Sequence, residues 1–505
     1  MRKVLVANRG EIAVRIMRAC RDLGIASVAV YSDADRAAPH VRYADEAYAL
    51  GPSAPAQSYL HIEKLVDVAR RAAADAVHPG YGFLAENEDF AAACRDAGLT
   101  FIGPSPEAIA LMGSKTAARQ TAARAGMPVV PGLAEPVDVS LEPTRLAQIA
   151  ESIGFPILVK AVAGGGGKGM RTVERPEDLA SAVRAAGSEA GSAFGDSSVY
   201  FERKLKRPRH IEIQVLADHH GRVVPFVERE CSIQRRHQKV IEESPSIAVT
   251  PELRRRLAEA AASVARAAGY ASAGTIETLL DEDGRFYFLE MNTRLQVEHP
   301  VTELVSGLDL VQWQIRVARG EALTIDPERT LQPNGHAIEC RVYAEDPDRR
   351  FMPCPGRIVH LQAPAGPGIR RDSGVEAGFD VPVFYDSMIS KLCAWGEDRP
   401  QAIARMRRAL SEYDVRGIRT TIPFFQWMLE QPDFIAGHFD TTSLDRILTD
   451  RTDPFLELSR ESEERTVVAA AIRELLRASS RSSDHGSTPR ASGWALAARR
   501  EALRN

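Results

Sequence analysis

Acidic, amide and guanidinium side chains are concentrated in one short stretch of the chain. They are Glu277, Glu290, Asn292, Arg294, Gln296 and Glu298. Carboxylate and amide oxygens are the ligands that Mg²⁺ prefers, and such a site keeps coordination positions open for phosphates. An arginine offers two parallel donors that suit a small carboxylate-like anion. These residue types therefore predict a site that holds metal ions and activates a small anion.

Two apolar runs separated by a polar turn predict that an antiparallel hairpin carries these side chains. The runs are residues 274–280 and 286–291, and the turn is Asp281–Gly284. β-branched and aromatic runs joined by a four-residue polar connection are typical of hairpins. The alternative interpretation is a solvated polar face on an edge hairpin.

The pairing of the two strands decides which side chains share a face. If Leu280 pairs with Arg285, Glu277 lies opposite Phe288. Because side chains alternate with period two, Glu290 and the amide two residues later share that face. The two phenylalanines of the second strand would lie there too and be covered, so the carboxylates would line the edge of a cleft. A β-bulge would change this parity.

The composition is that of a globular chain with several hydrophobic cores. With 505 residues, 44% of them apolar, the chain is long enough for two to four domains. A net charge of −4 gives no overall basic field, which argues against nucleic acid as the main partner. No apolar run reaches the roughly 18 residues that a membrane-spanning helix needs. The six cysteines show no paired metal spacing, so reduced thiols in a cytoplasmic protein are the simplest interpretation.

The N-terminal segment predicts a parallel sheet. An apolar run at Val4–Ala7 is followed by a helical pattern over Glu11–Asp22 and a second strand at Ala26–Tyr31. Such a strand–helix–strand opening is typical of a nucleotide fold. The turn lacks the three-glycine dinucleotide fingerprint, so Asp33 is not predicted to bind a ribose. His78–Phe83 predicts a constrained loop, which is either a structural turn or a ligand-facing loop.

A glycine-rich segment follows a predicted strand further along the chain. The strand is Ile157–Lys160, and Gly164–Met170 contains four consecutive glycines. Glycines let backbone N–H groups approach phosphate oxygens, so the segment predicts a flap over a nucleotide, with a plain flexible hinge as the alternative. No Gly-Lys-Ser/Thr helix start follows, which argues against a Walker loop. Lys115 and Lys160 are two candidate phosphate-binding cations.

Three further segments belong to the predicted site region. The strand Val199–Leu205 has a polar exit that could hydrogen-bond an adenine edge through its backbone and Glu202. Ile211–Val215 alternates as a strand does. The basic cluster Arg235–Lys239 has no interleaved aromatic residues, so an anion site near the hairpin is favoured over a nucleic-acid patch or a solvated face.

The C-terminal part carries fewer chemical signals. Short strands and turns are predicted at His336–Ala344 and Gly356–Leu361, followed by a helix at Arg399–Tyr413. In the tail, Thr466–Ala478 has an amphipathic helical pattern, and Ser479–Gly493 is Ser-rich and typical of a flexible segment.

Six segments together resemble the biotin carboxylase component of biotin-dependent carboxylases, which are ATP-grasp enzymes. The segments are Ala7–Ala13, His78–Leu84, Gly164–Met170, Glu228–Val240, Glu290–Pro300 and Glu339–Arg341. The resemblance spans residues 1–445 and implies an α/β fold, in part α+β. The implied parts are an N-terminal Rossmann-like pre-ATP-grasp domain at 1–113, an ATP-grasp domain at 114–320 with a lid at about 131–204, a C-terminal biotin carboxylase domain at 331–445, and a tail at 446–505.

The resemblance also implies roles for individual residues. Positions that contact ATP in the family are Lys115, Lys160, Gly166, Gly167, Glu202, Arg203, Lys204, Leu205, His210 and His237. The implied metal ligands are Glu277, Glu290 and Asn292. The implied bicarbonate pocket is Lys239, Arg294, Gln296, Val297 and Glu298. Arg341 matches the arginine that faces the biotin ureido oxygen, and Tyr81 and Asp386 lie in loops near that pocket.

Two positions depart from the family pattern. Arg203 stands where many members have lysine, and Ala163 replaces the first glycine of a longer glycine run in some bacterial members. Neither change removes a charge or a needed phosphate donor, so activity is still expected.

The predicted reaction is the MgATP-dependent carboxylation of biotin by bicarbonate, with Mn²⁺ as an alternative metal. Bicarbonate is a poor nucleophile, so a base should remove its proton while cations hold it in line with the γ-phosphate. We predict Glu298 as the base, Arg294 and Lys239 as the cations that hold the anion, and carboxyphosphate as the intermediate. Phosphate would then take the biotin N1 proton while Arg341 stabilises the enolate-like ureido oxygen.

The expected partners follow from a dipeptide that the chain lacks. No Met-Lys dipeptide occurs, whereas the biotinylated lysine of the family normally lies in Met-Lys-Met. We therefore expect a separate biotin carboxyl carrier protein, separate carboxyltransferase subunits and, by family likeness, a homodimer. Acetyl-CoA is the favoured final acceptor, and propionyl-CoA, another acyl-CoA and pyruvate stay open. The tail is expected to dock a partner subunit, with a disordered remnant as the alternative.

Two other functions compete with this one. An ATP-grasp carboxylate–amine or carbamoyl-phosphate-forming ligase would share the flap and the hairpin, but Arg341 and the bicarbonate set argue against it. An inactive regulatory scaffold would bind nucleotide, yet it would need none of Glu298, Arg294 and Lys239.

Overall fold

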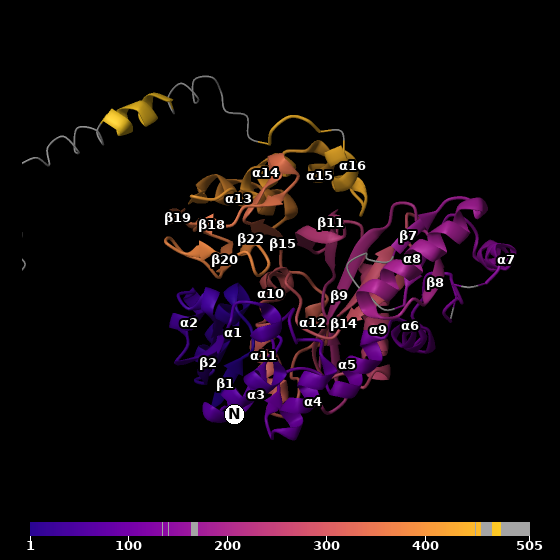
Figure 1. Ribbon diagram of the computed structural model, residues 1–505, viewed down its shortest axis with the longest axis horizontal. Coiled ribbons are helices and arrows are strands. Elements are labelled where there is room, and N and C mark those ends of the chain that lie inside the picture. Colours follow the sequence, from indigo (N-terminus) through magenta and orange to yellow (C-terminus); the bar gives the residue numbers. More distant parts are fainter. Residues whose placement is uncertain (134, 140, 163–169, 450, 456–466, 476–505) are drawn as a thin grey trace, which may run out of the picture. The chain divides into compact units, whose positions relative to one another are not determined.

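The computed structural model describes residues 1–133, 135–139, 141–162, 170–449, 451–455 and 467–475 (Figure 1). The chain divides into two units, Met1–Asp453 and Pro454–Asn505. In the second unit, residues 467–475 are helical, which agrees with the helix predicted at Thr466–Ala478. None of the helices within the described residues is both long enough and apolar enough to cross a membrane.

The N-terminal segment folds as the predicted parallel sheet. Its strands are β1 (Lys3–Val6), β2 (Ala26–Ser32), β3 (Glu46–Gly51), β4 (Ala76–His78) and β5 (Thr100–Phe101). They lie in the order β3-β2-β1-β4-β5, and every pair is parallel. Helix α1 (Gly10–Asp22) connects the first two strands and buries Ile12, Ile16 and Ala19, whose spacing matches one helical face.

The loops that follow β1 and β4 lie together at one edge of this sheet. Parallel neighbours place their carboxyl ends at the same edge, so Asn8 reaches the loop after β4. Its side-chain amide donates to the carbonyl oxygens of Pro79 at 2.7 Å and Tyr81 at 2.8 Å. The predicted constrained loop at His78–Phe83 is therefore held by a side chain of the first loop.

An antiparallel nine-stranded sheet forms the centre of the first unit. Its strands are β9 (Arg209–Ala217), β10 (Val223–Pro225), β11 (Arg229–Arg235), β12 (Gln238–Ser244), β13 (Ser272–Leu280), β14 (Phe286–Asn292), β15 (His336–Tyr343), β20 (Ile369–Ser373) and β22 (Met388–Gly396). The order is β14-β13-β9-β11-β12-β15-β22-β20, with β10 paired to β9. The β12–β15 pair carries the sheet across the predicted boundary between residues 320 and 331, and the domain boundaries stay a prediction.

The two faces of the central sheet have different partners. One face of β9, β13 and β14 packs against α5 (Pro106–Gly113), α6 (Lys115–Arg124) and α9 (Pro251–Ala267) in an apolar core. Ile211 and Ile213 of β9 belong to this core. Because strand side chains alternate, Glu212 and its neighbours at even positions lie on the opposite face, where a polar site can form.

The start of α9 shows how one hydroxyl supports this core. The Oγ1 of Thr250 accepts a hydrogen bond from the backbone N–H of Leu253 at 3.2 Å, and Pro251 occupies the first helical turn. We expect Thr250→Ala to lower the local unfolding free energy of α9 by about 1 kcal/mol, because the cap is lost. Hydrogen exchange of the first-turn amides measures the change. Thr250→Ser keeps the acceptor and is the control; equal exchange in both variants would contradict the capping role.

A small three-stranded sheet covers the site from the other side. Its strands are β6 (Ile157–Ala161), β7 (Met170–Val173) and β8 (Val199–Arg203), in the order β7-β6-β8. Helix α8 (Leu179–Phe194) packs against β6 and β7, and α7 (Pro143–Ile153) packs against α8 (Figure 1). The predicted glycine-rich flap, including Gly166 and Gly167, lies outside the described residues except for Met170, as does Ala163.

The remaining elements flank these three sheets. The helices are α2 (Pro39–Tyr43), α3 (Ile62–Arg71), α4 (Glu88–Asp96), α10 (His299–Ser306), α11 (Leu310–Ala318), α12 (Pro327–Thr330), α13 (Arg399–Glu412), α14 (Ile422–Met428), α15 (Pro432–Ala436) and α16 (Ser443–Thr449). Short strand pairs are β16 (Glu345–Asp346) with β17 (Met352–Pro353), β18 (Gly356–Arg357) with β21 (Asp380–Val381), and β19 (His360–Gln362) with β23 (Asp414–Arg416). The predicted helix at Arg399–Tyr413 is confirmed as α13, which packs against β15 and β22.

The predicted hairpin is present as β13 and β14, but its predicted register is wrong. Leu280 pairs with Phe286 rather than with Arg285. On the far side of the bulge, Glu277 pairs directly with Glu290. The two carboxylates are therefore closer neighbours than the predicted pairing placed them.

The predicted face of the phenylalanines is also wrong, and a β-bulge explains why. Phe288 pairs with the residue after Glu277, while Glu290 pairs with Glu277 itself, so Leu289 is the extra residue. A bulge reverses the alternation of side chains beyond it. Phe286 and Phe288 consequently lie in the core against the helices, whereas Glu277 and Glu290 lie on the opposite face.

Candidate active site

A cavity of about 400 Å³ lies between the central sheet and the small sheet. Most of the predicted site residues line it, and these are Lys115, Lys160, His210, His237, Lys239, Glu277, Glu290, Asn292, Arg294, Gln296, Val297, Glu298 and Arg341. Tyr200 and Gln234 contribute to the same wall. The residues predicted to bind metal and the residue predicted to act as base thus surround one cavity, although their roles stay predictions.

Lys239 of β12 lies among three carboxylates. Its Nζ is 2.5 Å from Oε2 of Glu212, 2.8 Å from Oε1 of Glu277 and 2.6 Å from Oε1 of Glu298. Burial would lower the pKa of Lys239, but the three negative charges outweigh burial and hold it well above its usual range. Lys239 is a permanent cation that joins the hairpin to the start of α10.

Glu298 is the N-cap residue of α10 and its side chain is fully buried. Besides the contact with Lys239, its Oε2 accepts a hydrogen bond from Nη2 of Arg341 at 2.9 Å. Burial opposes ionisation, yet the charges of Lys239, Arg341 and Arg229 together hold the pKa of Glu298 well below its usual range. The side chain is therefore an anion at neutral pH, as a proton acceptor must be.

Arg341 of β15 lies between two buried carboxylates. Its Nε donates to Oε1 of Glu242 at 2.6 Å while its Nη2 donates to Glu298. Burial raises the pKa of Glu242 to about 7, against the opposing charge of Arg341. Two partners thus fix the orientation of the guanidinium group. The N–H groups that they do not bind therefore point in defined directions.

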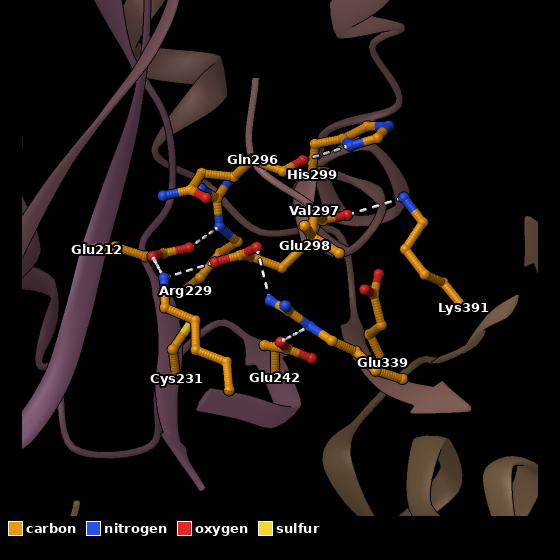
Figure 2. Close-up of polar contacts among 12 residues, drawn as sticks. Glu212, Arg229, Cys231, Glu242, Gln296, Val297, Glu298, His299, Glu339 and Lys391 are labelled. Atoms are coloured by element: carbon orange, nitrogen blue, oxygen red, sulfur yellow. Dashed lines mark hydrogen bonds and ion pairs between the residues drawn. The ribbon is translucent and has the colours of Figure 1, made fainter. Parts of the chain in front are cut away.

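A fully buried arginine, Arg229 of β11, contacts Glu212 beside this group (Figure 2). Its Nε contacts Oε1 of Glu212 at 2.5 Å, and its other nitrogens donate to Gln214, Thr302 and Thr275 at 2.9, 2.8 and 3.1 Å. Because Arg229 occupies one oxygen of Glu212, the other oxygen is directed at Lys239. The sequence-based prediction missed both residues, although Glu212 alternates with the core residues of β9.

Arg294 is oriented by residues from two segments. Its Nε donates to Oε2 of Glu86 at 2.8 Å, and its Nη1 and Nη2 donate to Oε1 of Gln296 at 2.8 Å and Oδ1 of Asn292 at 3.1 Å. Glu86 also accepts from the backbone N–H of Thr293 at 2.9 Å. Glu86 was not predicted, and its position just after the His78–Leu84 motif is the one signal that could have suggested it.

The predicted metal ligands fit a divalent cation. Glu277 and Glu290 are opposed across the hairpin at the cavity wall. The side chain of Glu290 has no hydrogen-bond partner within the described part of the chain. Two like charges facing a cavity are relieved when a cation binds between them. Asn292, whose amide donates to Glu277 at 2.9 Å, completes an oxygen-rich group.

A second grouping of metal-ligating atoms is less suitable. His210, Glu212 and Glu277 place one ligand atom each within 4.8 Å of one another. Both carboxylate oxygens of Glu212, however, are already bound, one by Arg229 and the other by Lys239. We therefore keep Glu277, Glu290 and Asn292 as the predicted ligands.

Glu202 is not among the described residues that line the cavity. Its buried carboxylate bridges Arg119 at 2.6 Å and Lys160 at 2.5 Å. Its contact with an adenine stays a prediction. Lys160 still lines the cavity, and Lys115 lies beside it with its Nζ 3.5 Å from the carbonyl oxygen of Ala161.

Three further predicted ATP residues are also absent from the cavity lining among the described residues. Arg203 donates to the hydroxyl of Tyr287 at 3.3 Å, and Lys204 pairs with Glu174 at 2.9 Å. Leu205 packs in a small apolar cluster with Tyr287. The contacts of these three residues with a nucleotide stay predictions.

A second cavity of about 520 Å³ adjoins the first. The two cavities share Gln238, Arg294, Val297 and Arg341. Tyr81 and Asp386, predicted to lie near the biotin pocket, line the second cavity, so the His78–Phe83 loop faces this cavity. Asp386 also accepts a hydrogen bond from the backbone N–H of Met388 at 2.7 Å.

Three family models match consecutive parts of the chain. The biotin carboxylase N-terminal domain matches residues 1–109, and the ATP-binding domain of the carbamoyl-phosphate synthase L chain matches residues 114–326. The biotin carboxylase C-terminal domain matches residues 339–446.

Curated relatives are similar along most of the present chain. Biotin carboxylase of Nostoc sp. is 52% identical, over 87% of this chain and 98% of the relative. A pyruvate carboxylase subunit of Methanothermobacter thermautotrophicus is 53% identical, over 88% of this chain and 89% of the relative. The mitochondrial alpha subunit of methylcrotonoyl-CoA carboxylase from Oryza sativa is 48% identical, over 93% of this chain and 64% of the relative.

Solved structures are similar at the level of the whole first unit. A Campylobacter jejuni biotin carboxylase complex with a β,γ-ATP ligand has a TM-score of 0.85 and 47% identity, covering 88% of this chain and 98% of the other. The biotin carboxylase domain dimer of Hydrogenobacter thermophilus 2-oxoglutarate carboxylase, solved with MgADP, ADP and bicarbonate, has a TM-score of 0.84 and 45% identity. That match covers 90% of this chain and 99% of the other.

Proposed function

The chain belongs to the biotin carboxylase family and has its ATP-grasp fold, and we propose that it carboxylates biotin on a separate carrier protein. Biotin carboxylases are ligases that use ATP, Mg²⁺ and bicarbonate. The observation that carries the proposal is the position of Glu298. It lies between Lys239 and Arg341 in the same cavity as Glu277 and Glu290. That arrangement supplies a base, two cations and a metal-ligating pair around one space.

In the proposed reaction, Arg294 and Lys239 hold bicarbonate. Arg294 is oriented by four hydrogen bonds, so its guanidinium group is held in place at low entropic cost. Lys239 has a raised pKa and keeps its charge throughout. These two cations place the bicarbonate oxygen within reach of Glu298 and in line with a γ-phosphate held near Lys160 and Lys115.

Glu298 removes the bicarbonate proton when the anion has bound. In the ligand-free arrangement, Lys239 and Arg341 make Glu298 a weak base. Bicarbonate brings a negative charge that competes for the same cations, so their hold on Glu298 weakens and its proton affinity rises. The activated bicarbonate attacks the γ-phosphorus of ATP, and carboxyphosphate and ADP are the products of this step.

The divalent cation would be held by Glu277, Glu290 and Asn292, and it would neutralise part of the negative charge on the ATP phosphates. Carboxyphosphate breaks down to CO₂ and phosphate inside the cavity. Phosphate then accepts the N1 proton of biotin, and Arg341 stabilises the ureido oxygen that gains negative charge. The second cavity, which adjoins the first at Arg341 and Val297, is the proposed place for biotin.

We propose acetyl-CoA carboxylase as the complete enzyme, with the carrier protein and carboxyltransferase as separate chains and a homodimer of the present chain. The relatives include subunits of pyruvate carboxylase and of methylcrotonoyl-CoA carboxylase. The predicted site assignments and domain boundaries belong to the same proposal.

ADP release in the presence of bicarbonate, measured with and without free biotin, tests this function. Stimulation by biotin is expected because biotin consumes the CO₂ equivalent that otherwise diffuses away. A carboxylate–amine ligase would instead respond to an amine, and a regulatory scaffold would release no ADP. Either of those outcomes would exclude the proposed function.

Glu290→Gln is expected to raise the Mg²⁺ concentration needed for half-maximal ADP release by at least about tenfold, since even residues that only support a metal ligand contribute that much. The substitution also removes the like-charge pair with Glu277. A titration of MgCl₂ at fixed ATP measures the shift. Glu282→Gln, an exposed carboxylate in the hairpin turn, is the control; the same Mg²⁺ dependence in both variants would mean that Glu290 is not a ligand.

We also propose that the tail docks a partner subunit. The helix at residues 467–475 exposes Val468, Ile472 and Leu475, which lie on one helical face. Removal of residues 454–505 should leave carboxylation of free biotin unchanged but weaken co-purification with the carboxyltransferase. Retained assembly after truncation would favour a remnant without a docking role.

A further inference from the structure

We propose that Lys391 is a positioning residue for the biotin carboxylase reaction: it fixes the peptide group before Glu298 and two walls of the second cavity. The inference rests on the proposed function, because it concerns the same site. Lys391 was not among the predicted site residues. It lies in β22, directly opposite Arg341 of β15 in the sheet register.

The first contact of Lys391 is with the backbone beside the proposed base. Its Nζ donates to the carbonyl oxygen of Val297 at 2.9 Å (Figure 2). That carbonyl belongs to the peptide that joins Val297 to Glu298, so its orientation sets the position of the Glu298 Cα. The bond therefore acts on the base through the main chain, without contact with the carboxylate.

Two further contacts reach the wall of the second cavity. Nζ of Lys391 is 3.3 Å from Oε2 of Glu11 and lies 5.6 Å from the ring centroid of Tyr81. Glu11, Tyr81 and Val297 all line that cavity. One ammonium group thus connects α1, the His78–Phe83 loop and the start of α10.

The environment of Lys391 favours a fixed cation. Its side chain is fully buried. Burial would lower the pKa of Lys391, but Glu11, Glu339 and Asp372 outweigh it and raise that pKa. Glu339 lies beside Lys391 on the neighbouring strand (Figure 2). A buried ion pair of this kind is weak evidence for stability but can specify one arrangement of the surrounding groups.

Replacement of Lys391 should therefore affect the three substrates to different extents. ATP is held by the small sheet and the hairpin, which Lys391 does not contact among the described residues. Bicarbonate and biotin lie on either side of Val297 in the proposed reaction. Loss of Lys391 should therefore affect the kinetics of bicarbonate and biotin, and leave those of ATP little changed.

The test uses the double variant K391M/E11Q, which removes both charges so that neither is left buried without a partner. We expect the KM for bicarbonate to rise at least about tenfold and kcat/KM for free biotin to fall at least about tenfold, while the KM for ATP stays within about twofold. Glu11→Gln alone is the control for the loss of the carboxylate and should show smaller changes.

A merely structural role predicts something else. The value of kcat would then fall with the folded fraction, and no KM would change. An unchanged KM for bicarbonate, together with an unchanged kcat/KM for biotin per folded enzyme molecule, would therefore overturn the proposal. If the double variant does not fold, Lys391→Arg decides. Its larger planar head keeps the charge but displaces the Val297 contact, so an at least threefold rise in the KM for bicarbonate is expected and an unchanged KM would overturn the proposal.

This outcome is separable from that of the proposed function. Stimulation of wild-type ADP release by biotin establishes the function whether or not Lys391 positions the site. Hydrogen exchange over residues 295–300 in the folded variant adds a direct readout, because faster exchange there is expected when the Val297 carbonyl loses its donor, while exchange in α9 stays as in the wild type.

Discussion

Glu298→Gln is expected to reduce bicarbonate-dependent ADP release by about 10²–10⁴-fold while ATP still binds, because a general base contributes a rate factor of that size. Glutamine has nearly the same shape but cannot accept the bicarbonate proton. The substitution leaves the proposed nucleotide cations Lys115 and Lys160 in place, so nucleotide affinity should be preserved. Single-turnover ADP formation and ATP binding by calorimetry measure the two quantities.

The control for this variant must remove a carboxylate without touching the cavity. Glu252→Gln, in the exposed first turn of α9, meets that requirement. Because Lys239 and Arg341 both lose a charged partner in Glu298→Gln, the thermal stability of the variant should be measured alongside. Turnover equal to that of the control in a folded sample would exclude Glu298 as the base.

Arg341→Lys is expected to separate the two halves of the reaction. Bicarbonate-dependent ADP release without biotin should stay within a few-fold of wild type, while formation of carboxybiotin should fall by about 10²–10³-fold, the effect of losing one oxyanion donor. A lysine keeps the positive charge beside Glu242 and Glu298. It lacks the planar guanidinium group, which can bind both carboxylates and at the same time present a donor to the second cavity.

The contrasting variant is Arg294→Lys. Arg294 is proposed to hold bicarbonate, so its replacement should lower ADP release and carboxybiotin formation together. Labelled bicarbonate and biotin, followed by separation of carboxybiotin, measure the second quantity for both variants. If Arg341→Lys lowers both rates to the same extent, Arg341 acts in the bicarbonate step and the proposed division of roles is incorrect.

The sequence contains enough local information to predict the parts of the fold that short patterns determine. The strand–helix–strand opening at residues 4–31 is confirmed because its apolar periods and turn residues agree. The β13–β14 hairpin is also confirmed, but its predicted register is not. The bulge at Leu289 depends on how the aromatic side chains of β14 pack against α5 and α6, and that packing partner is far away in sequence.

The candidate site divides in the same way. Residues that lie in conspicuous motifs, such as Lys239 and Glu298, are predicted from the sequence and do line one cavity. Their counter-charges are missed, since Glu86, Glu212 and Glu242 come from separate strands and loops and show no local chemical pattern. Residues that act by pairing with a partner remote in sequence can be identified from the folded structure but not from local sequence patterns.

Glu202 has ion-pair partners that the sequence does not indicate. A polar residue at a strand exit beside a predicted nucleotide site suggests a side-chain contact with adenine. In the structure the carboxylate is taken by Arg119 and Lys160. The sequence contains both cations, but nothing in their spacing indicates that they converge on one buried acid.

The central claim is that bicarbonate itself attacks the γ-phosphorus of ATP in the cavity around Glu298, and oxygen labelling tests it most directly. With ¹⁸O-labelled bicarbonate and short reaction times, carboxyphosphate must leave one bicarbonate oxygen on the phosphate that is released. The account predicts one ¹⁸O atom in each phosphate molecule by mass spectrometry. Phosphate without label would mean that water cleaves ATP, and would contradict the claim.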